Sequence, residues 1–558
     1  MHIPARQAAV ATVAALALAL SACGGPDDEG GGGGGGAAST GGEFSSYIGE
    51  PENPLIPGNT NETEGGQVVD SLWTGLVQYD AKTNEPEFTG VAKSIESDDQ
   101  QTWTITLNEG WTFHDGTPVD AQSFVDAWNW NAYGPNGAGN SYFFANIDGY
   151  DATQGEVETD DDGNVTKVVK EPESEKLSGL QVVDDLTFTV KLSGAFSIFP
   201  TTLGYTAFFP LPKVFFDDPE AFGKQPVGNG PWMANEPFEP GVGITLDKYN
   251  DYAGQDKAQA DRVELRVYAD ANTGYTDVQA GNLDISDTLP QSALSSGPDE
   301  FGERWVEGPR GDMTPLAFPL YDKRFADVRV RQAFSMAIDR DAITKSIFLG
   351  SRLPAHSFAS PVVEGYNDNA CAETTEFNPE KAKALLSESG FDTSKPVSLW
   401  FNSGAGHEEW MEAVGNQLKD NLGIVDYKLE SLDFAEYLPL RDSKKITGPY
   451  RAGWIMDYPH IQNFLAPIFT EAAQPPAGSN DTYYANEEFD ALVAEGDSAG
   501  TPEEAIAAYQ EAEQILCEDM PQAPLFYGKN QLVHSEKVDN VVFNAFGRIE
   551  LAQVTVKQ

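Results

Sequence analysis

The amino-acid sequence predicts a mixed α/β (α+β) fold. From about residue 44 onward, stretches that alternate apolar and polar residues recur between stretches with the apolar spacing of a helix. Hydrophobic residues make up 40 % and aromatic residues 11 % of the 558 residues, so the chain can fill a large core. At roughly 100–200 residues per domain, this length indicates several domains or one large body with several lobes.

The elements are predicted in chain order from these periodicities. Residues 66–79 begin with helical spacing and end like a strand. Asp327 suits the N-cap of one helix, and Asn378 and Gly390 suit the two ends of another. Further strands are expected at 102–107, 186–192 and 263–268, and further helices at 120–130, 328–343, 379–389, 408–422 and 502–518.

The composition is strongly acidic, with 87 Asp and Glu against 35 Lys and Arg and a formal net charge of −52. Such a surface cannot neutralise phosphates in bulk, which argues against nucleic acid as a partner. It also argues against adsorption to anionic lipid by charge. We interpret the charge as a hydrated coat that keeps the protein soluble.

The N-terminus predicts export and a lipid anchor. Residues 8–20 are apolar except for Thr12 and are too few to span a bilayer, which is typical of a secretory signal peptide. Leu20-Ser21-Ala22-Cys23 resembles the lipobox of lipoproteins, which implies cleavage before Cys23 and acylation of that cysteine. An ordinary signal peptide with an incidental cysteine is the alternative. We therefore expect a signal peptide at 1–22, and a lipidated Cys23 with a glycine-rich tether at 23–43.

Two cysteines remain for the exported body, Cys371 and Cys517. An even pair in an oxidising compartment favours a disulfide, and two buried free thiols are the alternative. A bridge would close a loop of about 147 residues, worth at most roughly 5 kcal/mol in the chain-entropy model.

The sequence offers no catalytic, metal-binding or cofactor motif. No Gly-x-Ser-x-Gly elbow occurs. His407-Glu-Glu-Trp-Met411 has Met where the helix of a zinc protease needs its second His. The acidic run at 160–164 lacks the spacing of a calcium loop and is better interpreted as a hairpin turn. These residues disfavour an enzyme, and no cofactor is expected.

Five phrases that occur in one order along the chain carry a resemblance to a known family. They are Gly110-Trp-Thr-Phe-His-Asp-Gly-Thr-Pro-Val119, Val227-Gly-Asn-Gly-Pro-Trp232, Gln279-Ala-Gly-Asn-Leu-Asp-Ile285, the run at 327–340, and Ala452-Gly-Trp-Ile-Met-Asp-Tyr-Pro459. On these phrases the chain resembles the bacterial extracellular solute-binding proteins of family 5, the ABC-transporter receptors for oligopeptides and dipeptides. Most of the phrases are structural on physical grounds: Asp115 and Gly116 suit a tight turn, and His114 is expected to be a turn or core histidine.

The resemblance implies a bilobal periplasmic-binding-protein-like fold with an extra inserted domain. Domain I would be discontinuous, at 44–85, 206–311 and 529–558. Domain II would be the insertion at 86–205, and domain III would span 312–528. The lobes would close over a ligand that contacts both of them.

The resemblance also implies where the two charged ends of a peptide would bind. In peptide-binding members an Asp receives the α-ammonium, and the matching residue here is Asp457. A loop aspartate that caps a turn is the alternative for Asp457. Arg451 matches a position that can meet a ligand carboxylate, for which a guanidinium has suitable bidentate geometry.

Four further residues complete the expected peptide site. Residues 451–454 would form an edge strand that pairs with the ligand backbone, with Gly453 allowing close approach. Trp454 would wall a side-chain pocket or pack in the core. Gly75 would offer a second backbone contact from domain I, and Tyr142 would be a lid contact from domain II or a core residue.

We therefore expect a lipid-anchored, monomeric receptor on the outer face of the cytoplasmic membrane, which captures peptides by lobe closure and delivers them to an ABC import permease. Its partners would be the peptide, the permease subunits and, through the lipid anchor only, the membrane. The alternatives are the same fold binding an oligosaccharide or another non-peptide solute, and a receptor whose peptide is a signal. Asp457 facing the cleft would favour peptide, whereas an aromatic-floored groove without an accessible carboxylate would favour sugar.

Overall fold

A 13-stranded sheet forms the framework of the chain, and its strands come from segments far apart in the sequence. The computed structural model describes residues 41–60, 62–159, 165–475 and 478–557. The predicted signal peptide, Cys23, the predicted tether up to residue 40 and the turn predicted at 160–164 lie outside the described residues. The order across the sheet is β10 (Trp232–Ala234), β11 (Gly243–Lys248), β12 (Arg262–Val267), β1 (Glu43–Ile48), β13 (Ile285–Ser286), β21 (Gln522–His534), β15 (Asp312–Ala317), β19 (Tyr450–Arg451), β17 (Val397–Asn402) and β18 (Tyr427–Leu432). Three strands pair off this path: β14 (Trp305–Pro309) and β16 (Arg352–Pro354) with β21, and β20 (Trp454–Ile455) with β15.

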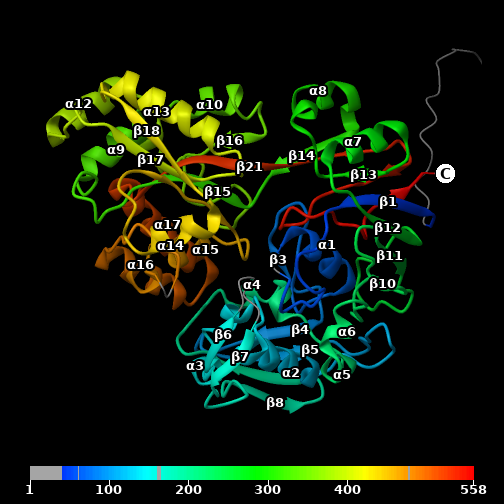
Figure 1. Cartoon of the computed structure of the whole chain (residues 1–558). Coiled ribbons are helices and arrows are strands. Elements are labelled where there is room, and N and C mark those ends of the chain that lie inside the picture. Colours follow the sequence, from blue (N-terminus) through cyan, green and yellow to red (C-terminus); the bar gives the residue numbers. More distant parts are fainter. Residues whose placement is uncertain (1–40, 61, 160–164, 476–477, 558) are drawn as a thin grey trace, which may run out of the picture. The chain divides into compact units, whose positions relative to one another are not determined.

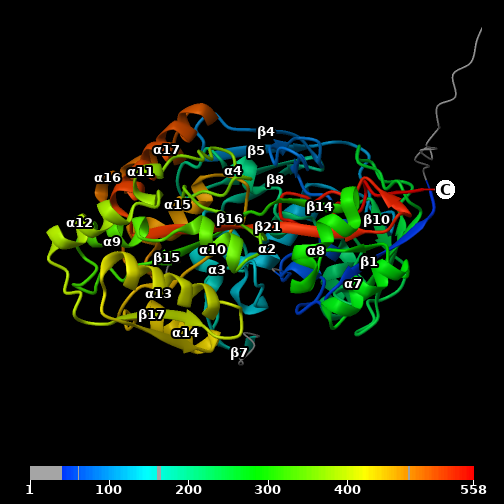
Figure 2. The same cartoon turned by 90° about the horizontal axis from the view of Figure 1, so that it is seen from above.

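The long strand β21 joins the two parts of this sheet (Figure 1 and Figure 2). Its first residues pair with β15 and β16, and its last residues pair with β14 and β13. Where the pairing partner changes, the Gly528 N–H donates to the Asp312 carboxylate at 2.5 Å, and the Arg310 N–H donates to the Gly528 carbonyl at 3.0 Å. A Cβ atom on Gly528 would lie 2.6 Å from that carboxylate, so the position requires glycine. The predicted domain borders after residues 311 and 528 fall at this crossing, while the division into three domains stays a prediction.

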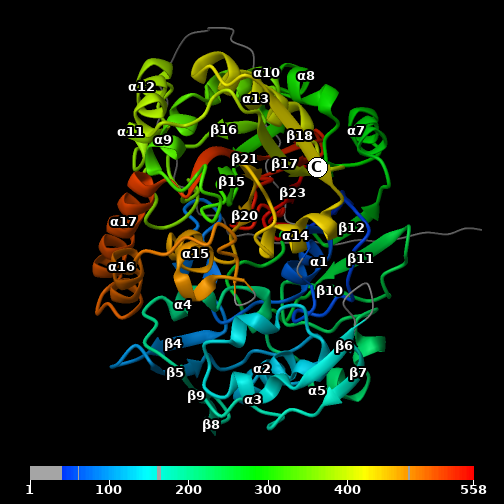
Figure 3. The same cartoon turned by 60° about the vertical axis from the view of Figure 1, so that its left-hand side comes forward.

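A second sheet is confined to the predicted insertion at 86–205. It contains β4 (Ala92–Glu96), β5 (Thr102–Leu107), β9 (Thr187–Lys191) and β8 (Leu180–Asp184), which pair antiparallel in that order. The helix α2 (Ala121–Ala132) packs beside it, as Figure 3 shows. Asp120 and Ser123 form a capping box that starts α2. The buried Trp128 of α2 then packs against the rings of Phe144, Phe188 and Phe208, so the helix is held by an aromatic core.

Short ribbons and helices complete the fold. The ribbons are β2 (Gln78–Tyr79) with β3 (Pro86–Glu87), β6 (Glu156–Thr159) with β7 (Val165–Lys170), and β22 (Val538–Asp539) with β23 (Thr555–Val556). The remaining α-helices are α1 (Thr63–Leu72), α3 (Tyr150–Gln154), α4 (Phe199–Thr202), α5 (Lys213–Asp217), α6 (Pro219–Phe222), α7 (Ala271–Ala280), α8 (Gln291–Phe301), α9 (Val328–Met336), α10 (Arg340–Ser346), α11 (Ala372–Thr375), α12 (Pro379–Ser389), α13 (Glu408–Leu422), α14 (Phe434–Asp442), α15 (Gln462–Phe469), α16 (Glu487–Asp497) and α17 (Pro502–Asp519). The 3-10 turns are η1 (Gly134–Asn136), η2 (Ser141–Phe144), η3 (Thr206–Phe208), η4 (Gly302–Arg304) and η5 (Glu471–Ala473).

Most of the predicted elements are confirmed, including the strand at 102–107 and the helices at 379–389 and 408–422. The single helix expected at 328–343 is wrong, because the chain breaks into α9 and α10. Asp339 caps α10 by accepting from the Ala342 N–H. The buried Arg340 donates to the carbonyls of Ser335 and Pro524, and these bonds fix the break. The change from helical to strand-like character expected within 66–79 is confirmed, because α1 ends at Leu72 and the chain then becomes extended in β2.

A disulfide joins Cys371, which precedes α11, to Cys517 in α17. Both cysteines are buried. The bridge therefore ties the loop ahead of α11 to the long helix near the C-terminus. In the described part of the chain, no helix combines the length and the apolar character needed to cross a membrane.

Candidate functional site

Asp457 lies in the loop between the edge strand β20 and the helix α15, and its carboxylate is held by side chains. Tyr142 donates to Oδ1 at 3.4 Å, and the Asn463 amide donates to Oδ2 at 3.1 Å. Among the described residues, no backbone N–H donates to this carboxylate. These contacts do not fit a turn-capping aspartate, because a cap accepts from backbone N–H groups. They bring a residue of the predicted insertion against a residue of the predicted domain III.

Asn463 orients this carboxylate. Its buried side chain accepts from the Asp457 N–H at 2.8 Å and from the Trp454 indole at 3.0 Å, while its amide donates to Asp457. The first turn of α15 therefore holds both the backbone and the side chain of Asp457. We name Asp457, Asn463 and Tyr142 the aspartate site.

The charge of Asp457 is not compensated within the described chain. No Lys, Arg or His nitrogen of the described residues lies within 4.0 Å of it, whereas seventeen other ion pairs occur, among them Arg441 with Asp481 at 2.9 Å. Burial raises the pKa of Asp457 to about 6, and the donors Asn463 and Tyr142 only partly oppose this. A half-buried carboxylate without a cation is costly, and a cationic ligand would remove that cost.

Arg451 is a second uncompensated charge, of opposite sign, six residues earlier in the chain. Its Nε atom is buried and has no hydrogen-bond partner in the described chain, and burial lowers the pKa of the group. Its guanidinium lies over Gly453, where a Cβ atom would be 3.0 Å from Nη2. Burial, together with the charges of Arg451 and Arg352, lowers the pKa of the nearby His407 to about 4, so His407 is neutral at pH 7. This neighbourhood favours an anionic group as its ligand.

The continuous edge strand expected at 451–454 is wrong. Arg451 ends β19, an inner strand of the sheet that pairs with β15 and β17. The chain leaves the sheet at Ala452 and Gly453 and returns as β20, which pairs with β15 alone. Of β19 and β20, therefore, only β20 presents a free strand edge. The exposed Gly453 directly precedes β20 and lies beside the Arg451 guanidinium.

The structure places the remaining predicted residues as follows. Trp454 is half-buried and packs against the main core, and its indole N–H donates to Asn463. Gly75 lines a cavity, its carbonyl accepts from the Val91 N–H, and Phe209 covers its Cα. Tyr142 lies in η2, is 53 % exposed, and stacks near Phe143 with ring centroids 4.5 Å apart. None of these placements tests a ligand contact, so the contacts stay predictions.

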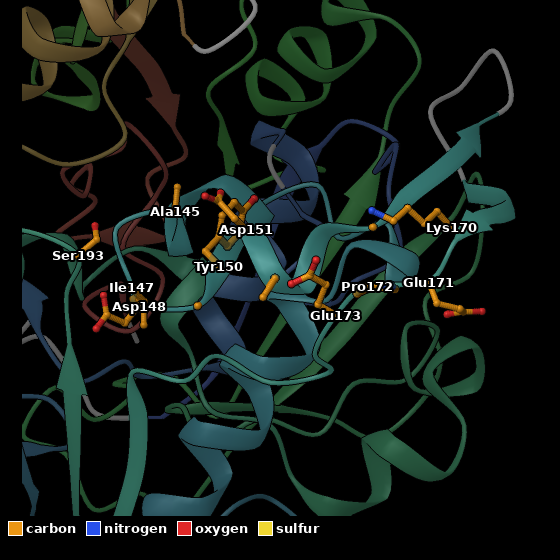
Figure 4. A pocket seen from close by; sticks show the side chains of 13 residues that line it. Ala145, Ile147, Asp148, Tyr150, Asp151, Lys170, Glu171, Pro172, Glu173 and Ser193 are labelled. Atoms are coloured by element: carbon orange, nitrogen blue, oxygen red, sulfur yellow. The ribbon is translucent and has the colours of Figure 1, made fainter.

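One large cavity is lined by none of these residues. It has a volume of about 610 Å³ and is a surface hollow of the insertion, between η2, α3 and the end of β7. Figure 4 shows acidic side chains on its walls, including Asp148, Asp151 and Glu173. Asp148 is paired with Lys191 at 2.8 Å. The hollow faces solvent and contains no predicted binding residue. We therefore take the aspartate site, and not this hollow, as the candidate ligand site.

No metal or catalytic site emerges from the described residues. They contain no group of three or more His, Cys, Asp or Glu that could hold a metal ion. His114 bonds to the backbone of Gly228 and Gly230, and burial lowers its pKa to about 4, so it is a structural histidine.

No signal in the sequence singled out Asn463, which holds Asp457 by two hydrogen bonds. It was visible only as part of the phrase that follows Asp457, and helical periodicity assigns it no role. Tyr205 was also missed, because its contacts come from a different part of the chain: its ring stacks on Phe143 at 4.3 Å and meets Phe546 edge-on at 5.6 Å.

Comparison with known proteins identifies the family of this chain. The family model "Bacterial extracellular solute-binding proteins, family 5 Middle" matches residues 89–475, and the chain therefore belongs to this family. Its members are solute-binding receptors of transporters and not enzymes.

Similar proteins cover nearly the whole chain. The dipeptide-binding protein DppE of Bacillus subtilis is 26 % identical over 553 residues, which is 96 % of each chain. The oligopeptide-binding protein OppA of Bacillus subtilis is 26 % identical over 512 residues, which is 89 % of each chain. The unliganded open form of the periplasmic murein tripeptide binding protein MppA superimposes with a TM-score of 0.78 at 24 % identity, covering 94 % of this chain and 99 % of that one, which shows the shared fold.

The raised pKa of Asp457 predicts a pH-dependent effect on stability. An unfolded Asp titrates near 3.9, so between about pH 4 and pH 6 the folded state binds more protons than the unfolded state. The free energy of unfolding therefore falls as the pH rises through this window, and above about pH 6 the full cost of the buried charge is present and constant. Relative to wild type, Asp457→Asn should gain about 1–3 kcal/mol of unfolding free energy between pH 4 and pH 7.5. Denaturant unfolding of ligand-free protein at several pH values measures this, with the exposed Asp251→Asn as the control. A difference between Asp457→Asn and wild type that does not change with pH would contradict the burial of an uncompensated charge.

Proposed function

We propose that the chain is a lipid-anchored receptor that captures peptides outside the cytoplasmic membrane and delivers them to an ABC import permease. Family membership supports solute binding, and the relatives reported above are named for a dipeptide, an oligopeptide and a murein tripeptide. The oriented, cation-free carboxylate of Asp457 is the observation that carries the peptide assignment.

The aspartate site suits an α-ammonium group. An ammonium has three donors and one positive charge, and Asp457 offers acceptor oxygens whose directions Asn463 fixes. The bond forms in a partly desolvated loop, where a charge-assisted contact is stronger than in water. A neutral sugar would leave the carboxylate uncompensated, so this site favours a peptide over an oligosaccharide.

The segment that follows Arg451 supplies what the rest of a peptide needs. The free edge of β20 can pair with an extended backbone, which gives affinity independent of the side chains. The Arg451 guanidinium is available for a carboxylate. Six residues of extended chain span at most about 20 Å, so one short peptide can reach from Asp457 to Arg451.

Closure on the ligand would use contacts between the insertion and domain III. Besides the Tyr142 contact with Asp457, Ser197 bonds through its N–H to the Asp497 carbonyl at 2.6 Å and through its hydroxyl to the Gly496 carbonyl at 2.9 Å. A ligand ammonium would compete with the Tyr142 hydroxyl for Asp457. Differential contacts of this kind allow a ligand to shift a conformational equilibrium.

A double-mutant cycle tests the peptide assignment. Asp457→Asn keeps the volume and removes the charge, and should weaken trialanine binding by roughly 3–5 kcal/mol, about two to four decades. Acetylating the N-terminus of trialanine should cost wild type a similar amount. The two losses should not add, because they remove one interaction. Calorimetry on both proteins with both peptides measures the cycle.

Asp497→Asn is the matched control, because Asp497 is a half-buried carboxylate with a raised pKa that accepts from two side chains, Tyr509 and Gln462. It should retain the preference for the free amine. If Asp457→Asn prefers the free amine as strongly as wild type does, Asp457 is not the ammonium site. If wild type binds an oligosaccharide and does not bind trialanine, the peptide assignment itself is wrong.

The anchor rests on Leu20-Ser21-Ala22-Cys23 and the glycine-rich tether. Cys23→Ser removes the acyl acceptor, so the protein should leave the membrane fraction with its binding intact. Fractionation of producing cells, followed by binding assays on the released protein, measures this. Membrane retention of the variant at the wild-type level would refute the anchor.

A further inference from the structure

Two adjoining cavities lie beside Gly75, between α1 and the C-terminal segment. The outer cavity has a volume of about 90 Å³ and the inner one about 20 Å³. Four residues line both of them: Asp70, Pro231, Asn544 and Glu550. We name the two cavities together the glutamate pocket, after Glu550.

The charge of Asp70 is already compensated, whereas that of Glu550 is not. The buried Arg548 pairs with Asp70 at 2.8 Å, and the Asn544 amide donates to the same carboxylate at 3.2 Å. Glu550 has no ion pair or side-chain hydrogen bond within the described chain. Burial raises its pKa to about 7, and the carboxylates of Asp70 and Asp256 add to the shift.

The walls of the outer cavity are aromatic, and the polar ends of three rings are already bonded. The Trp73 indole donates to the Pro210 carbonyl at 2.9 Å, the Tyr79 hydroxyl to the Thr201 carbonyl at 2.5 Å, and the Tyr252 hydroxyl bonds Thr74 at 2.9 Å. Phe546 completes the wall. Aromatic side chains therefore form much of the wall, and aromatic rings attract cations.

The inner cavity contains an independent sign of an occupant. Trp232 is fully buried and lines this cavity, and its indole N–H has no acceptor among the described residues. The cavity volume is sufficient for a water molecule. A water there would accept from Trp232 and donate to Glu550, leaving the other oxygen of Glu550 for a donor in the outer cavity.

A row of aromatic rings connects the aspartate site to this pocket. Tyr142, which contacts Asp457, lies against Phe143; Phe143 stacks on Tyr205 at 4.3 Å; and Tyr205 meets Phe546 of the pocket wall at 5.6 Å. An extended peptide covers about 3.3–3.6 Å per residue, so a few residues bridge this span.

We propose that the glutamate pocket binds a positively charged side chain of the peptide, an ammonium or guanidinium, with Glu550 as its counter-ion. This inference rests on the proposed function, because the side chain enters from a peptide whose N-terminus is held at Asp457. A cation removes the cost of burying Glu550 uncompensated and gains contacts with the aromatic walls. An acidic side chain would be repelled by Glu550 and by Asp256 of the outer cavity, and a neutral side chain would leave Glu550 unpaired.

Matched peptides test this pocket by calorimetry. Trialanine is compared with peptides that carry lysine at the first, second or third position, and with the same peptides carrying norleucine, which keeps the hydrocarbon chain and lacks the charge. Wild type should bind at least one lysine peptide about tenfold or more tightly than its norleucine partner. Glu550→Gln should abolish that preference and leave the affinity for trialanine within about twofold.

The exposed Glu536→Gln is the matched control and should keep the lysine preference. Equal affinity of wild type for every lysine and norleucine pair would overturn the proposal, as would a lysine preference that survives in Glu550→Gln. If trialanine still binds and its binding depends on Asp457, either result refutes only the pocket, and the proposed peptide function is unaffected. If wild type binds none of these peptides, the proposed function itself is contradicted. The wild-type comparison needs no variant, so the outcome does not depend on folding of Glu550→Gln.

Discussion

The central constraint of this structure is a half-buried carboxylate that the chain orients but does not neutralise. Asn463 holds Asp457 by its backbone N–H and by its side chain, and no cation of the described chain lies within ion-pair distance. Such an arrangement costs stability, because burial penalises the charged form. In a solute-binding protein the missing charge is most simply supplied by the solute. The peptide assignment, the expected lobe closure and the uncompensated Arg451 nearby are all consistent with that one requirement.

The fold places this loop where parts of the chain far apart in sequence meet. The strand β21 runs through both parts of the large sheet, and Gly528 allows the second crossing segment to pack against it. β15 continues from that crossing and supports both β19 and β20, so Arg451 and the Asp457 loop stand on a rigid strand. Tyr142, from the segment predicted to be the insertion, contacts Asp457.

Local signals made much of the fold predictable from sequence. Asn378 and Gly390 mark the ends of α12, and alternation marks β5, because capping and strand periodicity act over a few residues. The break at Asp339 was not predictable from periodicity, since it depends on Arg340 reaching the Pro524 carbonyl. Asp457 and Arg451 were predicted from a phrase shared with the family. The role of Asn463 depends on its hydrogen bonds to Asp457, which only the folded structure shows. The glutamate pocket could not be seen at all, because Asp70 and Arg548 are separated by 478 residues.

Proton release on binding tests the central claim most directly. At pH 6 Asp457 should be about half protonated without ligand, and an ammonium bound to it should drive its ionisation. The α-amino group of trialanine stays protonated at that pH and contributes nothing. Calorimetry in buffers of different ionisation enthalpy should therefore report release of about half a proton per trialanine, and none for Asp457→Asn. Wild-type binding without proton release, or with proton uptake, would contradict the account.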